Sequence, residues 1–264
     1  MSVHWPIFRS LLRNARKTMM VDDRRSYTGA EILVASFHVA SEIERRCSTD
    51  KVGLMLPTSA AFPIAALAGW MLGRTIVPLN YLLKPEELDY VIDHCGTDFV
   101  LTAGPLLDAV GRRPTVKSLS LIEDIDFKAV PELRWPALAD DDQLASLIYT
   151  SGTTGKPKGV MLTHGNLVAN IQQGARGMRA TPNEVFLGVL PQFHCFGVTQ
   201  LTLTPLTIGA KVVYTARFNP GKIFALAKEH QATVFIGIPS MYGALINAKG
   251  GKPEDFASMR LMVS

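Results

Sequence analysis

The chain has 264 residues, of which 47% are hydrophobic and 19% are charged, and its formal net charge is +4. This composition is typical of a packed globular protein and excludes a disordered chain. The 27 Lys and Arg residues are scattered, which favours a mildly basic protein that binds a nucleotide and an acid over one that binds nucleic acid.

Near the N-terminus, residues 4–17 place apolar side chains at helical spacing among basic ones. They lack the continuous apolar core of a signal peptide, so we predict a first helix packed on the domain. Peripheral contact with a membrane surface is the alternative. The most apolar run, residues 60–72, is too short to span a bilayer, which takes about 20 residues.

Strands and helices then alternate in chain order. We expect strands at 18–22, 52–56, 75–79 and 98–101, separated by helices at 28–46, 60–73 and 85–96. Thr28 and Glu31 form the sequence pattern of a capping box at the start of the first of these helices. The succession predicts an α/β fold in which layers of parallel sheet are covered by helices.

Prolines interrupt the pattern between residues 104 and 142, where we expect a strand at 118–122 and then a connecting segment. This segment is the candidate seam between two α/β subdomains, residues 1–140 and 141–264. Alternation then resumes, with helices expected at 166–178, 197–208, 220–230 and 239–249 and strands at 185–190, 211–214, 233–238 and 260–263.

The stretch from Tyr149 to His164 reads YTSGTTGKPKGVMLTH. Its glycines permit tight turns and close approach to a ligand, while its hydroxyl groups and two lysines supply hydrogen-bond donors and positive charge. Such a loop can surround a polyphosphate. The P-loop pattern does not fit, because Pro157 stands five residues after Gly152 and cannot lie inside a following helix. We therefore expect the loop to join two strands, at 147–149 and 160–162.

The order from Thr150 to Gly159 resembles the phosphate loop of the adenylate-forming, or AMP-binding, superfamily, [ST]-S-G-[ST]-T-G-x-P-K-G, at every position. The resemblance covers residues 27–264 and implies the N-terminal portion of that family's large domain. It also implies two sets of phosphate-binding residues. The first holds the β- and γ-phosphates of ATP and consists of Thr150, Ser151, Gly152, Thr153, Thr154 and Gly155. The second offsets the phosphate charge and consists of Lys156 and Lys158.

The segment from Pro191 to Gly197, PQFHCFG, follows a predicted strand and precedes a predicted helix, where open α/β sheets bind ligands. It resembles the P-x-F-H-x-x-G segment of acyl-CoA synthetases. The resemblance implies that His194 lies at the acyl carboxylate, as a substrate-binding and catalytic residue, and the alternative is a structural histidine. We interpret Cys195 as a small buried side chain and not as a nucleophile.

Gly237, Ile238 and Pro239 resemble the segment that lines the acyl pocket in the family, and a simple strand-to-helix turn is an equal alternative. None of the histidines shows metal-ligand spacing, and we interpret His164 as structural. The three cysteines are far apart and form no C-x-x-C pair, so they indicate neither a disulfide framework nor a zinc site. A reducing, cytoplasmic compartment fits them best.

Together the resemblances imply activation of a carboxylate, expected to be a fatty acid, by ATP and Mg²⁺ to an acyl-adenylate. The acyl group then passes to a thiol of coenzyme A or a carrier protein. The family's adenine-binding and ribose-binding segments and its C-terminal lid domain, with a catalytic lysine, would follow residue 264. We therefore expect a truncated portion of a ligase that is inactive alone. A non-catalytic nucleotide-binding or regulatory module is the alternative, and a phosphotransferase is disfavoured.

Overall fold

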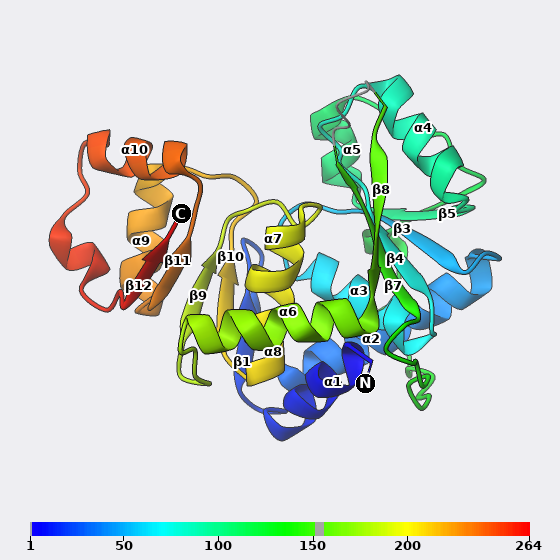
Figure 1. The fold of residues 1–264 in the computed structure, drawn as a ribbon, viewed down its shortest axis with the longest axis horizontal. Helices are drawn as coiled ribbons and strands as arrows, with labels where there is room; N and C mark the ends of the chain where they lie inside the picture. The colour runs from blue at the N-terminus through cyan, green and yellow to red at the C-terminus, as the bar shows by residue number, and fades with distance from the viewer. Residues whose placement is uncertain (1, 151–155) are drawn as a thin grey trace.

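The computed structural model describes residues 2–150 and 156–264. Their strands form two six-stranded sheets, each flanked by helices, so the α/β fold expected from the alternating pattern is confirmed. Figure 1 shows one sheet on the left and in the centre, ending at β12, and the other on the right. We call them sheet A and sheet B.

Sheet A has the strand order β12-β11-β9-β10-β1-β2, and its neighbours run parallel except for the antiparallel pair β1 and β2. Its strands are short and come from both ends of the chain. They are β1 (Thr18–Val21), β2 (Ser26–Thr28), β9 (Val185–Gly188), β10 (Lys211–Tyr214), β11 (Val234–Ile236) and β12 (Leu261–Val263).

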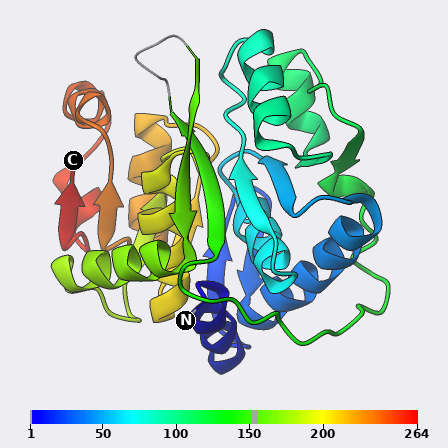
Figure 2. The same ribbon diagram turned by 45° about the vertical axis from the view of Figure 1, so that its right-hand side comes forward.

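Sheet B has the order β6-β5-β3-β4-β7-β8 and is parallel except for the antiparallel pair β7 and β8. Figure 2 shows β7 and β8 as two long strands side by side. The strands of the sheet are β3 (Lys51–Met55), β4 (Thr75–Pro78), β5 (Phe99–Thr102), β6 (Ser118–Leu121), β7 (Leu144–Thr150) and β8 (Lys158–Thr163).

The division between the sheets does not coincide with the seam expected near residue 140. Strands β7 and β8 follow that seam but complete sheet B, where Ile76 on β4 pairs with Ser146 on β7. Strand β1 precedes it but joins sheet A, where Met20 pairs with Val212 on β10. A break in helix–strand alternation marks a connection along the chain, whereas sheet membership depends on pairing between distant segments.

The helices pack on and between the sheets around one large hydrophobic cluster. This cluster includes Met20 on β1, Ile32 on α2, Val52 on β3 and Trp70 on α3, and therefore joins the two sheets. The helices are α1 (His4–Arg13), α2 (Gly29–Arg46), α3 (Ala61–Met71), α4 (Pro85–Cys95), α5 (Gly104–Val110), α6 (His164–Gly177), α7 (Cys195–Val198), α8 (Thr204–Ile208), α9 (Pro220–His230) and α10 (Pro239–Asn247).

Two helical predictions differ from the structure. Helix α5 lies in the region expected to be irregular, because its seven residues are too few to show a clear apolar period. Its ends carry ordinary signals, Pro105 at the first turn and Gly111 as a left-handed C-cap with φ of 68°. The helix expected at 197–208 is instead α7 and α8 joined by a π-helical turn over Thr199–Leu203.

The first helix packs on the domain, as expected from the sequence. The side chains of Ile7, Phe8 and Leu11 on α1 are buried, and His4 Nε2 lies 2.8 Å from the carbonyl oxygen of Ala137. Among the helices that the structure describes, none is long and apolar enough to cross a membrane.

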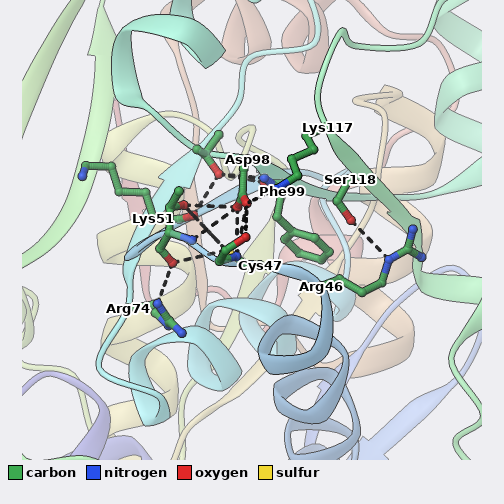
Figure 3. A network of polar contacts seen from close by, with 11 residues as sticks. Arg46, Cys47, Lys51, Arg74, Asp98, Phe99, Lys117 and Ser118 are labelled. Carbon is green, nitrogen blue, oxygen red and sulfur yellow. Dashed lines mark hydrogen bonds and ion pairs between the residues drawn. The ribbon is translucent and has the colours of Figure 1, made fainter.

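A polar network fixes the amino ends of β3, β5 and β6 (Figure 3). The Asp98 carboxylate accepts hydrogen bonds from the backbone N–H groups of Ser48, at 3.1 Å, and Thr49, at 3.4 Å. Burial raises the pKa of Asp98, but the hydrogen bonds from these residues outweigh it and leave the pKa below its usual value. The buried Cys47 thiol donates to the carbonyl oxygen of Lys51, and burial raises its pKa. This network is structural, since it lies at the edge opposite the strand ends described next.

Candidate functional site

The two motifs singled out in the sequence lie at the same edge of the fold. Strands β4 and β7 are parallel neighbours, so their carboxyl ends lie side by side, and β7 ends at Thr150, where the phosphate loop begins. Beyond the end of β4, the ring of Tyr81 meets the ring of Phe193 edge-on, with centroids 4.9 Å apart. Phe193 directly precedes His194. The His194 segment therefore lies near the end of β4, and β4 is the neighbour of β7, which leads into the phosphate loop.

The phosphate loop joins two antiparallel strands, as the sequence predicts. Tyr149 on β7 lies opposite Gly159 on β8, and a β-carbon added to Gly159 would lie 3.1 Å from the tyrosine ring. The ring therefore covers the glycine. This cross-strand contact helps to hold β7 and β8 in register. The Tyr149 hydroxyl lies 2.7 Å from Nδ1 of His94 on α4. Burial raises the pKa of Tyr149 to about 12, so this hydroxyl is neutral at ordinary pH.

The described end of the phosphate loop presents two exposed lysines. Lys156 Nζ lies 5.2 Å from the centroid of the Tyr90 ring on α4, a cation–π contact. Lys158 opens β8 opposite Thr150, and both of these residues are exposed. Positive charge and a hydroxyl group therefore stand at the mouth of the loop. Ser151, Gly152, Thr153, Thr154 and Gly155 lie outside the described residues.

Tyr90, His94 and Tyr149 contact one another in turn beside the described ends of the phosphate loop, and sequence reasoning did not assign them a role. Tyr90 and His94 lie one helical turn apart on α4, so their side chains are on the same face. That spacing was visible in the sequence. The sequence did not show which segment this face of α4 contacts, because α4 and the strands of the loop come together only through the pairing of β4 with β7.

The His194 segment is held on both sides. Gln192 accepts a hydrogen bond from the backbone N–H of Ser59, at 3.0 Å, and donates one to the Thr202 hydroxyl, at 3.1 Å. A β-carbon at Gly197 would lie 2.1 Å from the carbonyl oxygen of Pro191, so only glycine fits there. The P-x-F-H-x-x-G pattern thus has a local physical reason.

His194 is the N-cap residue of α7, and its ring lies 4.6 Å from that of Phe193, centroid to centroid. His194 is exposed. The desolvation that its ring still undergoes lowers the pKa of His194, which favours the neutral imidazole at neutral pH. A neutral imidazole can donate one hydrogen bond to a carboxylate. Cys195 is exposed, so the expectation that it is a buried side chain is wrong.

Gly237, Ile238 and Pro239 lie at the carboxyl end of β11, which pairs in parallel with β9. Since β9 leads into the His194 segment, both segments emerge at one edge of sheet A. Gly237 is buried, and a β-carbon there would lie 3.1 Å from the ring of Phe235 and 3.4 Å from that of Tyr242. Aromatic rings therefore occupy the space beside this glycine. Ile238 and Pro239 are exposed.

In residues 2–150 and 156–264, no three His, Cys, Asp or Glu side chains are grouped so that they could hold a metal ion. His164, interpreted as structural, is buried, and its Nδ1 accepts a hydrogen bond from the backbone N–H of Val3, at 3.2 Å. Burial and the neighbouring His4 lower the pKa of His164 to about 4.

Comparison with known proteins gives consistent matches. A family model described as "AMP-binding enzyme" matches residues 7–264. The mitochondrial malonate–CoA ligase of Homo sapiens is 29% identical, over 91% of this chain and 45% of its own length. The feruloyl-CoA synthase of an Amycolatopsis species is 30% identical, over 81% of this chain and 43% of its own length.

Solved structures agree. ATP-bound MatB from Rhodopseudomonas palustris superposes with a TM-score of 0.83 and 25% identity, over 99% of this chain and 54% of its own. A benzoate CoA ligase from Burkholderia xenovorans LB400 has the same fold, with a TM-score of 0.87 and 24% identity, over 99% of this chain and 55% of its own. The chain spans about half the length of the curated relatives it matches.

Proposed function

The chain belongs to the AMP-binding enzyme family, and from this premise we propose that it is a portion of an ATP-dependent acid–thiol ligase. The observation that carries the proposal is the position of the two motifs at one edge of the fold. The exposed lysines at the described end of the phosphate loop follow β7, and Lys156 lies over Tyr90 of α4. The His194 segment contacts Tyr81 beyond the end of β4, the strand next to β7. We therefore assign the anion and the carboxylate to the same edge of the fold.

The proposed reaction has two steps. A carboxylate oxygen attacks the α-phosphorus of ATP and expels pyrophosphate, which gives an acyl-adenylate. A thiol, of coenzyme A or of a carrier protein, then takes the acyl group and releases AMP. Thr150, Lys156 and Lys158 offer a hydroxyl and two positive charges for the phosphates, and Mg²⁺, when bound to them, would neutralise further charge. His194 would orient the carboxylate through a hydrogen bond from its neutral ring.

For the acid, we propose a small or flat carboxylate in place of the fatty acid that the His194 motif suggested. The names of the relatives refer to malonate and ferulate. The rings of Phe235 and Tyr242 fill the space beside Gly237, which supports a short or planar acid over a long acyl chain. The cytoplasmic compartment stays a proposal, and the human relative is named as mitochondrial.

The test is carboxylate-dependent exchange between ATP and labelled pyrophosphate, measured on the native gene product. We expect exchange with at least one acid from a panel of malonate, ferulate, 4-coumarate, benzoate, octanoate and palmitate. His194→Ala should lower the exchange rate by about tenfold to a hundredfold, and His230→Ala, at the last residue of α9, should not.

Two outcomes would overturn the proposal. ATP binding without exchange for any acid would make the protein a nucleotide-binding module without catalysis. Transfer of the γ-phosphate to an acceptor would make it a phosphotransferase. Binding itself can be measured on the 264-residue chain by calorimetry, where Lys156→Ala should weaken ATP binding by about tenfold relative to the exposed control Lys249→Ala.

A further inference from the structure

The N-terminal helix α1 and the turn after it carry positive charge that the rest of the chain does not neutralise. Residues 2–21 contain Arg9, Arg13, Arg16 and Lys17 and no Asp or Glu. All four basic residues are exposed, and none of them forms an ion pair within residues 2–150 and 156–264. This part of the surface therefore attracts an anionic partner.

Large apolar side chains lie on the same surface as these charges. On α1 itself, Leu12 is 55% exposed. Beside α1, Trp135 is 79% exposed, although its ring contacts that of Trp5 with the two centroids 5.4 Å apart. The guanidinium carbon of Arg9 lies 5.7 Å from the centroid of the same Trp5 ring. Basic and apolar groups are therefore interleaved on one face of the molecule.

The spacing of residues along α1 explains this arrangement. Trp5, Arg9 and Leu12 are four and three positions apart, which places them on one side of the helix. Ile7 and Leu11, on the other side, are buried in the core. Figures 1 and 2 show α1 at the lower edge of the molecule, opposite the ends of β7 and β8 that lead into the phosphate loop. The exposed side of α1 is thus far from the candidate site.

Hydrogen bonds hold the segment that contains Trp135 beside α1. The carbonyl oxygen of Ala137 accepts a hydrogen bond from Nε2 of His4, at 2.8 Å. The backbone N–H of Ala137 donates to the carbonyl oxygen of Met71, also at 2.8 Å. Leu138, the next residue, is 84% exposed. Two large apolar side chains of this segment are therefore held in water next to the basic helix.

A membrane surface with anionic phospholipids matches this combination of groups. Arginine side chains are attracted to the negative headgroups, and tryptophan and leucine side chains enter the boundary between headgroups and acyl chains. A nucleic acid would use the charges but would leave Leu12 and Leu138 in water. A protein interface is centred on side chains that fill pockets, whereas α1 lies on an outer edge of the molecule (Figure 2).

We propose that this face, called the α1 face, binds the surface of a membrane that contains anionic phospholipids. The α1 face consists of Arg9, Leu12, Arg13, Arg16, Trp135 and Leu138. The protein lies on the membrane through these side chains and does not enter further. Because the phosphate loop begins at the opposite edge, its entrance stays open to water in this orientation. The proposal does not rest on the ligase activity.

The experiment is co-sedimentation of the native gene product with lipid vesicles. One set of vesicles contains phosphatidylcholine alone, and the other contains phosphatidylcholine with about 30% phosphatidylglycerol. We expect at least tenfold tighter binding to the anionic set. That binding should weaken at about 1 M salt, where the Debye length is about 3 Å. Equal binding to the two sets, or no binding to the anionic set, would overturn the proposal.

Charge variants locate the contact. Arg13→Glu should weaken binding to the anionic vesicles at least fivefold, because each basic residue near an anionic surface strengthens binding about fivefold. The matched control is Arg113→Glu, at an exposed arginine that has no ion pair in the part of the chain that the structure describes. It should leave binding unchanged. Equal weakening by the two variants would show that net charge, and not the α1 face, governs binding.

Apolar variants test the second part of the proposal. Trp135→Ser should weaken binding by about tenfold and Leu138→Ser by about threefold to tenfold, since their apolar surface then stays out of the membrane. Ile246→Ser, at an isoleucine 83% exposed on α10, is the control and should have no effect. Thermal unfolding checks that each variant is folded.

Two results would assign the α1 face to another partner and overturn the proposal. The first is tight binding of single-stranded RNA that Arg13→Glu abolishes, with vesicle binding that Trp135→Ser and Leu138→Ser leave unchanged. The second is self-association of the protein, measured by analytical ultracentrifugation without lipid, that Leu138→Ser abolishes. The α1 face would then bind a nucleic acid or a second copy of the chain.

Discussion

At the scale of single residues, close backbone approaches decide which glycines the site requires. Gly197 sits where an added β-carbon would lie 2.1 Å from a backbone carbonyl oxygen, which cannot move aside as a side chain can. Gly243, within α10, has nothing within 4 Å of such a β-carbon. The two glycines have the same intrinsic backbone freedom. Their different surroundings therefore lead us to predict opposite effects of substitution on stability.

We predict that Gly197→Ala lowers the free energy of unfolding by about 1–3 kcal/mol, because the methyl group forces Pro191 and α7 apart. Gly243→Ala should raise it by about 0.5–1 kcal/mol, because alanine favours the helix. Urea denaturation followed by circular dichroism measures both. Equal stability of Gly197→Ala and the original protein would show that the His194 segment tolerates a side chain there.

His164 should make the stability of the protein depend on pH. Burial lowers its pKa to about 4 in the folded state, below the ordinary value of 6.5. The unfolded chain therefore binds a proton more readily, so stability is complete above pH 6.5 and falls as the pH drops towards 4. The loss in the free energy of unfolding over this pH range is roughly 3 kcal/mol, because each unit of difference between the folded and unfolded pKa values contributes about 1.36 kcal/mol.

His164→Asn separates this effect from other titrations, because its amide oxygen can accept the hydrogen bond of Val3 and does not titrate. We expect its free energy of unfolding to fall less steeply between pH 6.5 and pH 4 than that of the original protein. An unchanged slope in His164→Asn would assign the pH dependence to other groups.

At the scale of elements, the β7–β8 hairpin is joined to α4 through the Tyr149 side chain. The ring covers Gly159 within the hairpin, and the hydroxyl meets His94 outside it. Tyr149→Phe keeps the first contact and removes the second. We predict a loss of about 1 kcal/mol in the free energy of unfolding, the usual contribution of one hydrogen bond.

The same variant tests the titration of Tyr149. Its pKa is about 12 in the folded protein and about 10 in an unfolded chain. The folded state then holds the proton more tightly, so its stability declines as the pH rises from 10 towards 12. Denaturation at several alkaline pH values should show a shallower decline for Tyr149→Phe. A decline that is identical in the two proteins would mean that the hydroxyl is not shielded as the structure shows.

At the scale of the whole molecule, strands exchanged between the two halves of the sequence bind the sheets into one unit. Residues 1–140 contain β1, which pairs with β10, and β4, which pairs with β7. The largest hydrophobic cluster includes residues of both sheets. Neither half can complete its sheet or bury its apolar surface alone.

We therefore predict a single cooperative unfolding transition, with the same midpoint by circular dichroism and by tryptophan fluorescence. Residues 1–140 and 141–264, produced separately, should each lack a cooperative transition. If either half unfolds cooperatively on its own, residue 140 would separate two independent folding units. The pairing of β1 with β10 would then not be required for either half to fold.

The sequence by itself determined the α/β fold, the position of nearly every helix and strand, and the two motifs of the site. These features depend on local chemistry, such as the capping residues of α2, the apolar runs of β3 to β5 and the glycines between β7 and β8. Even the strict pattern around His194 has a local cause, since Gly197 contacts Pro191, six positions earlier.

The tertiary structure alone decided which distant segments meet. It assigned β1 to the sheet of β10, brought Tyr90 and His94 of α4 to the base of the phosphate loop, and placed Trp135 against Trp5 of α1. Strand pairing and side-chain contacts of this kind join residues far apart in the sequence. No local periodicity records them, because the free energy that selects them arises only when both surfaces are buried together.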